Sequence, residues 1–160
     1  MDTTLPVDKI QQLGELLKQQ KKHAVLVGGC FDLFHYGHIT LLEEAKKQAD
    51  VLIVLLESDE RIRKLKGSER PLHTQKQRAH MLIALRSVDY VILLPKDVHD
   101  SNYDMIVKQI QPAIIATTKD SSSLRYIEKQ AADSNAEIYL VDPIENLSTS
   151  RIVAVVAKEL

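Results

Sequence analysis

The sequence feature that most constrains the fold is a regular alternation of short apolar runs with amphipathic stretches. The apolar runs are rich in Val, Ile and Leu and are mostly unbroken, as in strands that are buried on both faces of a sheet. The stretches between them repeat apolar residues at helical spacing, which is typical of crossover helices between parallel strands. The sequence therefore predicts an α/β fold, a Rossmann-like open parallel five-stranded sheet with helices on both faces. The expected strands span residues 23–29, 51–57, 90–94, 113–117 and 137–141.

Helical periodicity also appears before the first of these strands. A leading helix over about residues 7–20 has its apolar residues on one face, so it should pack beside the domain rather than form another. We therefore expect an N-terminal helix packed on the domain within residues 1–22 and one domain over residues 23–160. The other expected helices span residues 37–48, 74–86, 103–110, 122–132 and 148–160.

Composition limits the compartment and the partners. A hydrophobic content of 44% over 160 residues is enough for one buried core. The charged residues nearly cancel, to a formal net charge of -1, so no global field would draw the protein to nucleic acid or anionic lipid. The longest apolar runs are too short to cross a bilayer, and the start lacks a signal pattern. We expect a cytoplasmic protein with neither nucleic-acid nor membrane partners.

The residues that best explain a chemical function follow the first expected strand, where ligands bind in an open parallel sheet. Gly28 and Gly29 would let a phosphate approach the backbone closely, and a helix that begins near Gly37 would aim free N–H groups at that anion. His35 and His38 can both reach one phosphate group and donate hydrogen bonds as negative charge develops. This pattern predicts a phosphoryl-transfer site.

The same segment allows two other interpretations. The histidines would be ordinary polar surface if the segment were only a capping loop, but a pair of them directly after two glycines favours a site. His-x-x-His can also supply two metal ligands, yet no third His or Cys lies close in sequence. The single cysteine, Cys30, excludes a multi-cysteine zinc site and an internal disulfide. We therefore favour phosphate binding over metal binding as the role of His35 and His38.

At this point the sequence resembles the cytidylyltransferase-like superfamily of nucleotidyltransferases. Its signature is a Phe-Asp pair followed by His-x-Gly-His, and a later Ser-Thr-Thr/Ser stretch opens the last helix. The resemblance implies an HUP-type nucleotidyltransferase fold. It also implies transfer of a nucleoside monophosphate from a nucleoside triphosphate to a phosphorylated small-molecule acceptor, with release of pyrophosphate. The matching residues are Phe31-Asp32, His35-Tyr36-Gly37-His38 and Ser148-Thr149-Ser150.

Within the superfamily, the sequence looks most like the heptose-1-phosphate adenylyltransferase domain of ADP-heptose synthesis. Residues 41–46 and 86–89 look equally like glycerol-3-phosphate cytidylyltransferase. Residues 116–121 depart from the Lys-Gly-x-Asp-type stretch of many relatives. Adenylyl transfer to heptose 1-phosphate is the leading interpretation, and cytidylyl transfer to glycerol 3-phosphate or a related phospho-alcohol is the alternative. The heptose-type stretches are Gly29-Cys30-Phe31-Asp32, Lys64-Leu65-Lys66-Gly67, Arg70-Pro71 and Gln77-Arg78-Ala79.

The resemblance assigns roles residue by residue. The catalytic residues are His35, His38 and Lys66, and Lys66 is expected in a flexible stretch over residues 61–70, from which it can swing over the phosphates. The acceptor phosphate is expected at Lys64 and Arg78, although Lys64 and Lys66 in a charge run are also compatible with a solvated face and Arg78 with a helix-surface ion pair. The nucleotide is expected at Gly29, Cys30, Phe31, Asp32, His35, His38, Ser148, Thr149 and Ser150.

Cofactor and partners follow from the same resemblance. Mg²⁺ is expected to arrive with the nucleoside triphosphate, without a metal site made by the protein itself. The protein is expected to form a homodimer. A non-catalytic nucleotide-binding module, suggested by the unusual loop at residues 117–123, is the alternative from another functional class.

Overall fold

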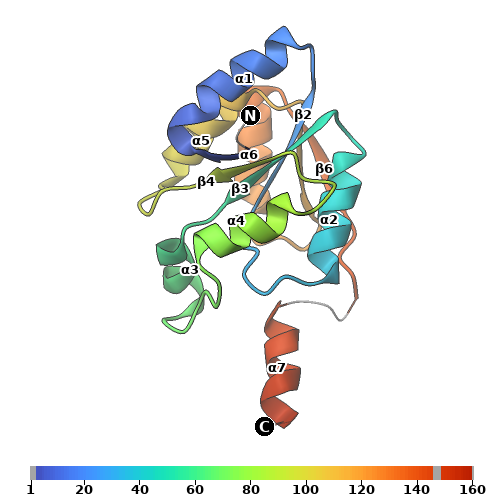
Figure 1. The fold of residues 1–160 in the computed structure, drawn as a ribbon. Helices are drawn as coiled ribbons and strands as arrows, with labels where there is room; N and C mark the ends of the chain where they lie inside the picture. Colours follow the sequence, from blue (N-terminus) through green and yellow to red (C-terminus); the bar gives the residue numbers. More distant parts are fainter. Residues whose placement is uncertain (1–2, 146–148, 160) are drawn as a thin grey trace.

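The computed structural model describes residues 3–145 and 149–159. Its centre is one parallel sheet of six strands in the order β1-β4-β3-β2-β5-β6 (Figure 1). The α/β class and the parallel sheet are confirmed, and the structure adds one short strand to the five expected. The strands are β1 Thr4–Pro6, β2 Ala24–Gly29, β3 Val51–Leu56, β4 Tyr90–Leu93, β5 Ile114–Thr118 and β6 Glu137–Val141.

Helices cover both faces of the sheet, and two apolar clusters mark these faces. α1 Ile10–Gln19, α5 Asp100–Ile110 and α6 Leu124–Ser134 pack against one face, while α2 Tyr36–Lys46 and α4 Gln75–Ile83 pack against the other. Alternate residues of β2 and β3 contribute to the two clusters, as the two-residue period of a strand requires. The sheet is therefore buried on both sides, which explains its unbroken apolar runs.

The N-terminal segment belongs to the sheet and to the core. β1 pairs with β4 at the edge of the sheet, and a short 3₁₀ turn, Val7–Lys9, leads into α1. α1 packs against α5 so closely that a Cβ on Gly14 would lie 2.3 Å from the backbone oxygen of Gln109. The leading helix is present, but the strand in front of it was not predicted.

A second unpredicted element follows β3. Residues 61–70 were expected to be a flexible stretch, whereas the structure has a helix, α3 Asp59–Lys66. The Ser58 hydroxyl caps this helix by accepting a hydrogen bond of 3.1 Å from Arg61 N. Gly67 then ends it in a positive-φ conformation, at 98°. Most cationic side chains of this segment are therefore carried on a short helix, and Arg70 follows it.

The last helix, α7 Thr149–Glu159, lies beyond the carboxyl ends of the strands, below the rest of the fold in Figure 1. Val153, Val155 and Val156 on it are about half exposed, at 45%, 50% and 52%. In the described part of the chain, no helix combines the length and apolarity that a membrane crossing needs.

Candidate active site

A pocket of about 520 Å³ opens at the carboxyl ends of the strands, where β2 and β5 are paired. After β2 the chain crosses to the face that carries α2, and after β5 it crosses to the face that carries α6. This is a topological switch point, the place where open α/β sheets bind ligands. The loop after β2, which leads to His35 and His38, therefore lies at the position expected of a binding site.

The floor of the pocket is made by the end of β2. Gly28 and Gly29 both line it, and a Cβ on Gly29 would lie 2.8 Å from the ring of Phe31. Phe31 has a positive φ of 47° and is only 3% exposed, because the chain turns sharply and folds this ring back beneath the glycine. Gly29 is therefore required by packing, and it also leaves the backbone open to a ligand.

The two predicted histidines form a stacked pair at the start of α2. Their ring centroids are 3.8 Å apart with an interplanar angle of 24°. The backbone N–H of His35 donates a hydrogen bond of 3.3 Å to Nδ1 of His38, so Nδ1 carries no proton. The neutral His38 ring then holds its proton on Nε2. The rings of Phe31 and Phe34, at 5.1 and 5.4 Å, fix its orientation.

Both imidazoles favour the neutral form. Burial lowers the pKa of His38 to about 4, helped by the charges of His35 and Lys66. Burial, and then Lys66, also lowers the pKa of His35. At neutral pH each ring is therefore an uncharged donor of one N–H group, which can stabilise charge on a phosphate without carrying charge itself.

Lys66, at the C-terminal end of α3, lines the same pocket. Its side chain is exposed, and its positive charge acts on both histidines and on Cys30. Burial raises the pKa of the Cys30 thiol, although Lys66 opposes the shift. Lys64 lies on the exposed surface of α3 and is not among the residues that line this pocket.

Asp32 is buried beneath the site and bonded to the segment after α3, and its contact with the nucleotide stays a prediction. It is 1% exposed and accepts hydrogen bonds from Arg70 Nε at 2.5 Å, Leu72 N at 2.8 Å and His73 N at 3.4 Å. Burial alone would raise the pKa of its carboxyl group, but these hydrogen bonds outweigh burial and hold the pKa below its usual value. Asp32 thus fastens the segment after α3 beneath the site.

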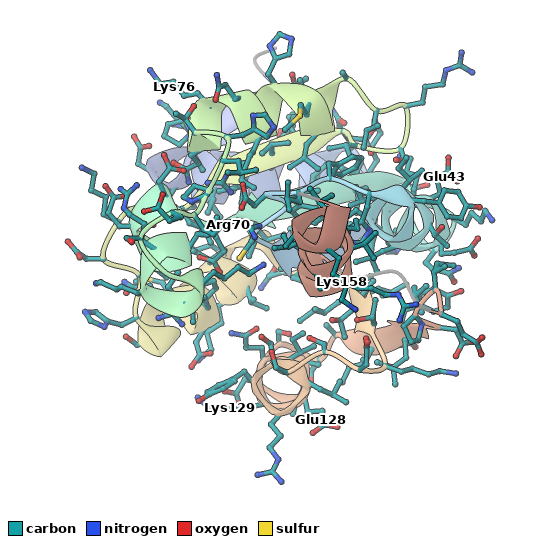
Figure 2. The ribbon with its side chains drawn as sticks, turned by 90° about the horizontal axis from the view of Figure 1, so that it is seen from below. Glu43, Arg70, Lys76, Glu128, Lys129 and Lys158 are labelled. Carbon is teal, nitrogen blue, oxygen red and sulfur yellow. The ribbon has the colours of Figure 1, made fainter. Side chains whose placement is uncertain are left out.

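Figure 2 looks up at this end of the molecule. Arg70, the ionic partner of Asp32, lies near the middle of the view, whereas Glu43 and Lys76 lie toward its rim.

Arg78 is also buried next to the site. Its side chain has 0% exposure and is not among the residues that line the pocket, so the helix-surface ion pair is excluded and its role at the acceptor phosphate stays a prediction. It donates to the backbone oxygens of His73 at 3.0 Å, Cys30 at 2.5 Å and Glu57 at 2.8 Å, and its Nη2 pairs with Asp59 at 2.7 Å. The guanidinium therefore ties together the ends of β2 and β3.

The Ser-Thr-Ser stretch is described only in part. Thr149 lines the pocket at the start of α7, Ser148 lies outside the described residues, and nothing is described of the Ser150 side chain. The opposite wall contains polar residues that the site prediction left out, from the end of β5 and from the loops after β5 and β6. Their signal was a polar cluster directly after an expected strand. They are Thr117, Thr118, Asp120, Ser121, Ser122 and Asp142.

The described residues, 3–145 and 149–159, contain no cluster of three or more His, Cys, Asp or Glu side chains that could hold a metal ion. Asp120 and Asp142 are the carboxylates along the pocket wall, and Asp142 is paired with Lys119 at 2.5 Å. Such a donor set fits a divalent cation that is bound mainly by the phosphates of a nucleotide.

Comparison with known proteins agrees with this geometry. The model of a family described as cytidylyltransferase-like matches residues 26–155. A bifunctional protein HldE from Campylobacter jejuni subsp. doylei is 38% identical over 143 residues, which are 89% of this chain and 30% of that protein. The HldE of Geotalea uraniireducens is 33% identical over 156 residues, 95% of this chain and 31% of the relative. The chain thus spans about a third of the length of these relatives.

Two solved structures share the fold. A lipopolysaccharide core biosynthesis protein from Thermoplasma volcanium has a TM-score of 0.61 and 26% identity, over 77% of this chain and 97% of that one. Pantothenate synthetase from Thermus thermophilus has a TM-score of 0.65 and 14% identity, over 96% and 71% of the two chains. At that identity the second match shows the fold alone.

Proposed function

Since the chain belongs to the cytidylyltransferase-like family, we propose that it is a nucleotidyltransferase. It transfers a nucleoside monophosphate from a nucleoside triphosphate to a phosphorylated small molecule and releases pyrophosphate. The observation that carries this proposal is the stacked pair of neutral histidines, His35 and His38, which shares the pocket at the switch point with Lys66.

The reaction is an in-line displacement at the α-phosphorus. A phosphate oxygen of the acceptor forms a bond to this phosphorus as the bond to the β-phosphate oxygen breaks, and the electron pair leaves with pyrophosphate. The nucleophile is already an anion, so no general base is needed. Catalysis then consists of positioning and stabilisation of charge in the transition state.

The chain's own groups supply that stabilisation. His38 donates from Nε2, because its Nδ1 already accepts from the His35 backbone. Free N–H groups in the first turn of α2, which begins at Tyr36, favour an anion in front of them. Lys66 adds a mobile positive charge that can follow the phosphates as pyrophosphate leaves. Magnesium held by the triphosphate would neutralise part of its charge.

For the substrates, we propose ATP and heptose 1-phosphate. The support is the resemblance to heptose-1-phosphate adenylyltransferase domains, the 33–39% identity to HldE proteins and the 26% identity to the lipopolysaccharide core biosynthesis protein. CTP with glycerol 3-phosphate is the second pair, supported by residues 41–46 and 86–89. A homodimer and a cytoplasmic location are also proposed, and the exposed valines of α7 support self-association.

The test is pyrophosphate release from each of ATP, CTP, GTP and UTP, with magnesium and either acceptor, together with the mass of the product. We expect release with ATP and heptose 1-phosphate. His35→Ala and His38→Ala should each lower turnover by about two to four powers of ten, while His80→Ala, an exposed position on α4, should not. Nucleotide binding without pyrophosphate release from any pair would instead identify a binding module.

A further inference from the structure

A second polar group lies beside the pocket, on the side away from β5. Glu57 directly follows β3, and its backbone N–H donates to the oxygen of Gly29 at 3.1 Å. One guanidinium, that of Arg78, bonds to the backbone oxygens of both Glu57 and Cys30. Glu57 is thus fixed next to the pocket floor, but on the β3 side rather than the β5 side.

Two neighbours complete this group, from two different helices. Tyr103 on α5 donates its hydroxyl hydrogen to Oε1 of Glu57 at 2.5 Å. Arg61 on α3 acts on the charges of both Glu57 and Tyr103. A strand end and two helices therefore converge on one small polar cluster, which we call the Glu57 cluster: Glu57, Arg61 and Tyr103.

The Glu57 cluster has hydrogen-bonding capacity that the described residues do not use. Oε2 of Glu57 and Nε of Arg61 are both buried, and neither has a hydrogen-bond partner. A buried polar atom without a partner costs about 1–3 kcal/mol, so such atoms call for an explanation. Here one is an acceptor and the other a donor. A hydroxyl group both donates and accepts, so hydroxyls of a ligand can satisfy both atoms.

The charge states suit this use. Burial raises the pKa of Glu57, and it outweighs the hydrogen bond from Tyr103 and the charges of Arg61 and Arg78, which act to lower this pKa. Burial and the hydrogen bond to Glu57 raise the pKa of Tyr103 as well. Tyr103 therefore stays a donor and occupies Oε1, which leaves Oε2 for a further donor.

The position of the Glu57 cluster points to the acceptor rather than the nucleotide. The polar wall at the end of β5 and in the loops after β5 and β6 lines the other side of the pocket and offers hydrogen-bonding groups for a base and ribose. Lys66, which reaches the phosphates, ends the same helix that carries Arg61. Five residues of helix span about 7–8 Å, roughly the distance from a sugar phosphate's phosphorus to the far hydroxyls of its ring.

We propose that Glu57, Arg61 and Tyr103 bind the ring hydroxyls of the acceptor, and so select a polyhydroxylated sugar phosphate over a smaller alcohol phosphate. This inference rests on the proposed function and assigns the residues that recognise the acceptor. Glu57 is the specificity-determining residue, with Oε2 accepting from a sugar hydroxyl. Arg61 donates to a neighbouring hydroxyl, and Tyr103 holds the carboxylate in place.

The experiment compares Glu57→Gln and Tyr103→Phe with the wild type, using ATP and heptose 1-phosphate. A lost hydrogen bond to a charged group predicts a rise in the KM for heptose 1-phosphate of about 10- to 100-fold in Glu57→Gln. Tyr103→Phe should raise it by a smaller factor, and the KM for ATP should stay within about twofold in both. The matched controls are Glu60→Gln, on the outer surface of α3, and Tyr126→Phe, an exposed tyrosine on α6.

Three outcomes would distinguish a failure of the acceptor assignment from a failure of the proposed function. A wild type that releases no pyrophosphate would refute the proposed function and remove the basis of the acceptor assignment. An active wild type whose acceptor KM is unchanged in both variants would overturn the role of the Glu57 cluster alone. Equal rises in the KM for ATP and for heptose 1-phosphate would also overturn it, since they indicate general damage to the site.

Discussion

Replacing His38 by Asn tests the electrostatics of the histidine pair. The Asn Oδ1 can accept the hydrogen bond that Nδ1 of His38 accepts from the His35 backbone, but the side chain no longer titrates. In the wild type, the pKa of His38 is lowered from 6.5 to about 4 on folding. Between these values the unfolded chain binds more protons than the folded one, so the free energy of unfolding falls as the pH falls.

The size of this loss follows from the two pKa values. Between about pH 7 and about pH 5, protonation of His38 in the unfolded chain should remove about 2 kcal/mol of stability, and below about pH 4 this contribution should level off. The Asn variant lacks this contribution. The pKa of His35 shifts in the same direction and remains in both proteins, so the difference between them isolates His38.

The assay is urea unfolding of the wild type and of His38→Asn at the two pH values, with His80→Asn as the exposed control. The wild type and the control should lose about 2 kcal/mol more than His38→Asn on going to the lower pH. Equal losses in all three proteins would show that His38 is not held neutral by the fold, and would refute the proton assignment at Nε2.

Three further predictions test packing and charge. Gly14→Ala should lower the free energy of unfolding by about 1–3 kcal/mol, because its Cβ would overlap the backbone oxygen of Gln109. Helix propensity alone predicts that the same change raises this free energy by about 1 kcal/mol, so the sign of the change in urea unfolding distinguishes the two effects. Arg78→Met should lower it by about 3 kcal/mol, because Asp59 and backbone oxygens lose their buried partner, whereas exposed Arg125→Met should have little effect in the same assay. Lys66→Ala should lower turnover by about 10- to 100-fold without changing which triphosphate is used; a changed base preference in initial-rate assays would contradict its place at the phosphates.

The sheet was predictable because its strands are buried on both faces and therefore appear in the sequence as apolar runs. Two elements were missed for physical reasons. β1 is three residues long and ends in Pro6, which is too short for a two-residue period to be visible and is tolerated because the strand lies at the sheet edge. α3 is so rich in charged residues, with Ile62 as its buried residue, that it resembles a solvated loop.

In the candidate site, the sequence predicted the groups that face the pocket better than the groups beneath it. His35, His38 and Lys66 follow a strand or end a helix beside it, and the structure gathers them in one pocket. Asp32 and Arg78 stand in the same motifs of the sequence as charged residues, but they bond mainly to backbone N–H and C=O groups. Backbone partners leave no trace in side-chain patterns, so their burial was not predictable.

The Glu57 cluster could not be predicted from the sequence either. Glu57 and Tyr103 are 46 positions apart in sequence, and neither stands in a motif. Their contact depends on how α5 packs across the end of β3, which only the three-dimensional structure reveals.

The most direct test of the central claim is a single-turnover reaction with ATP and a heptose 1-phosphate whose phosphate oxygens carry ¹⁸O. Attack by the acceptor phosphate on the α-phosphorus predicts that all of the label is found in the nucleotide-sugar and none in pyrophosphate. Label in pyrophosphate, or release of AMP or inorganic phosphate in its place, would contradict nucleotidyl transfer at this site.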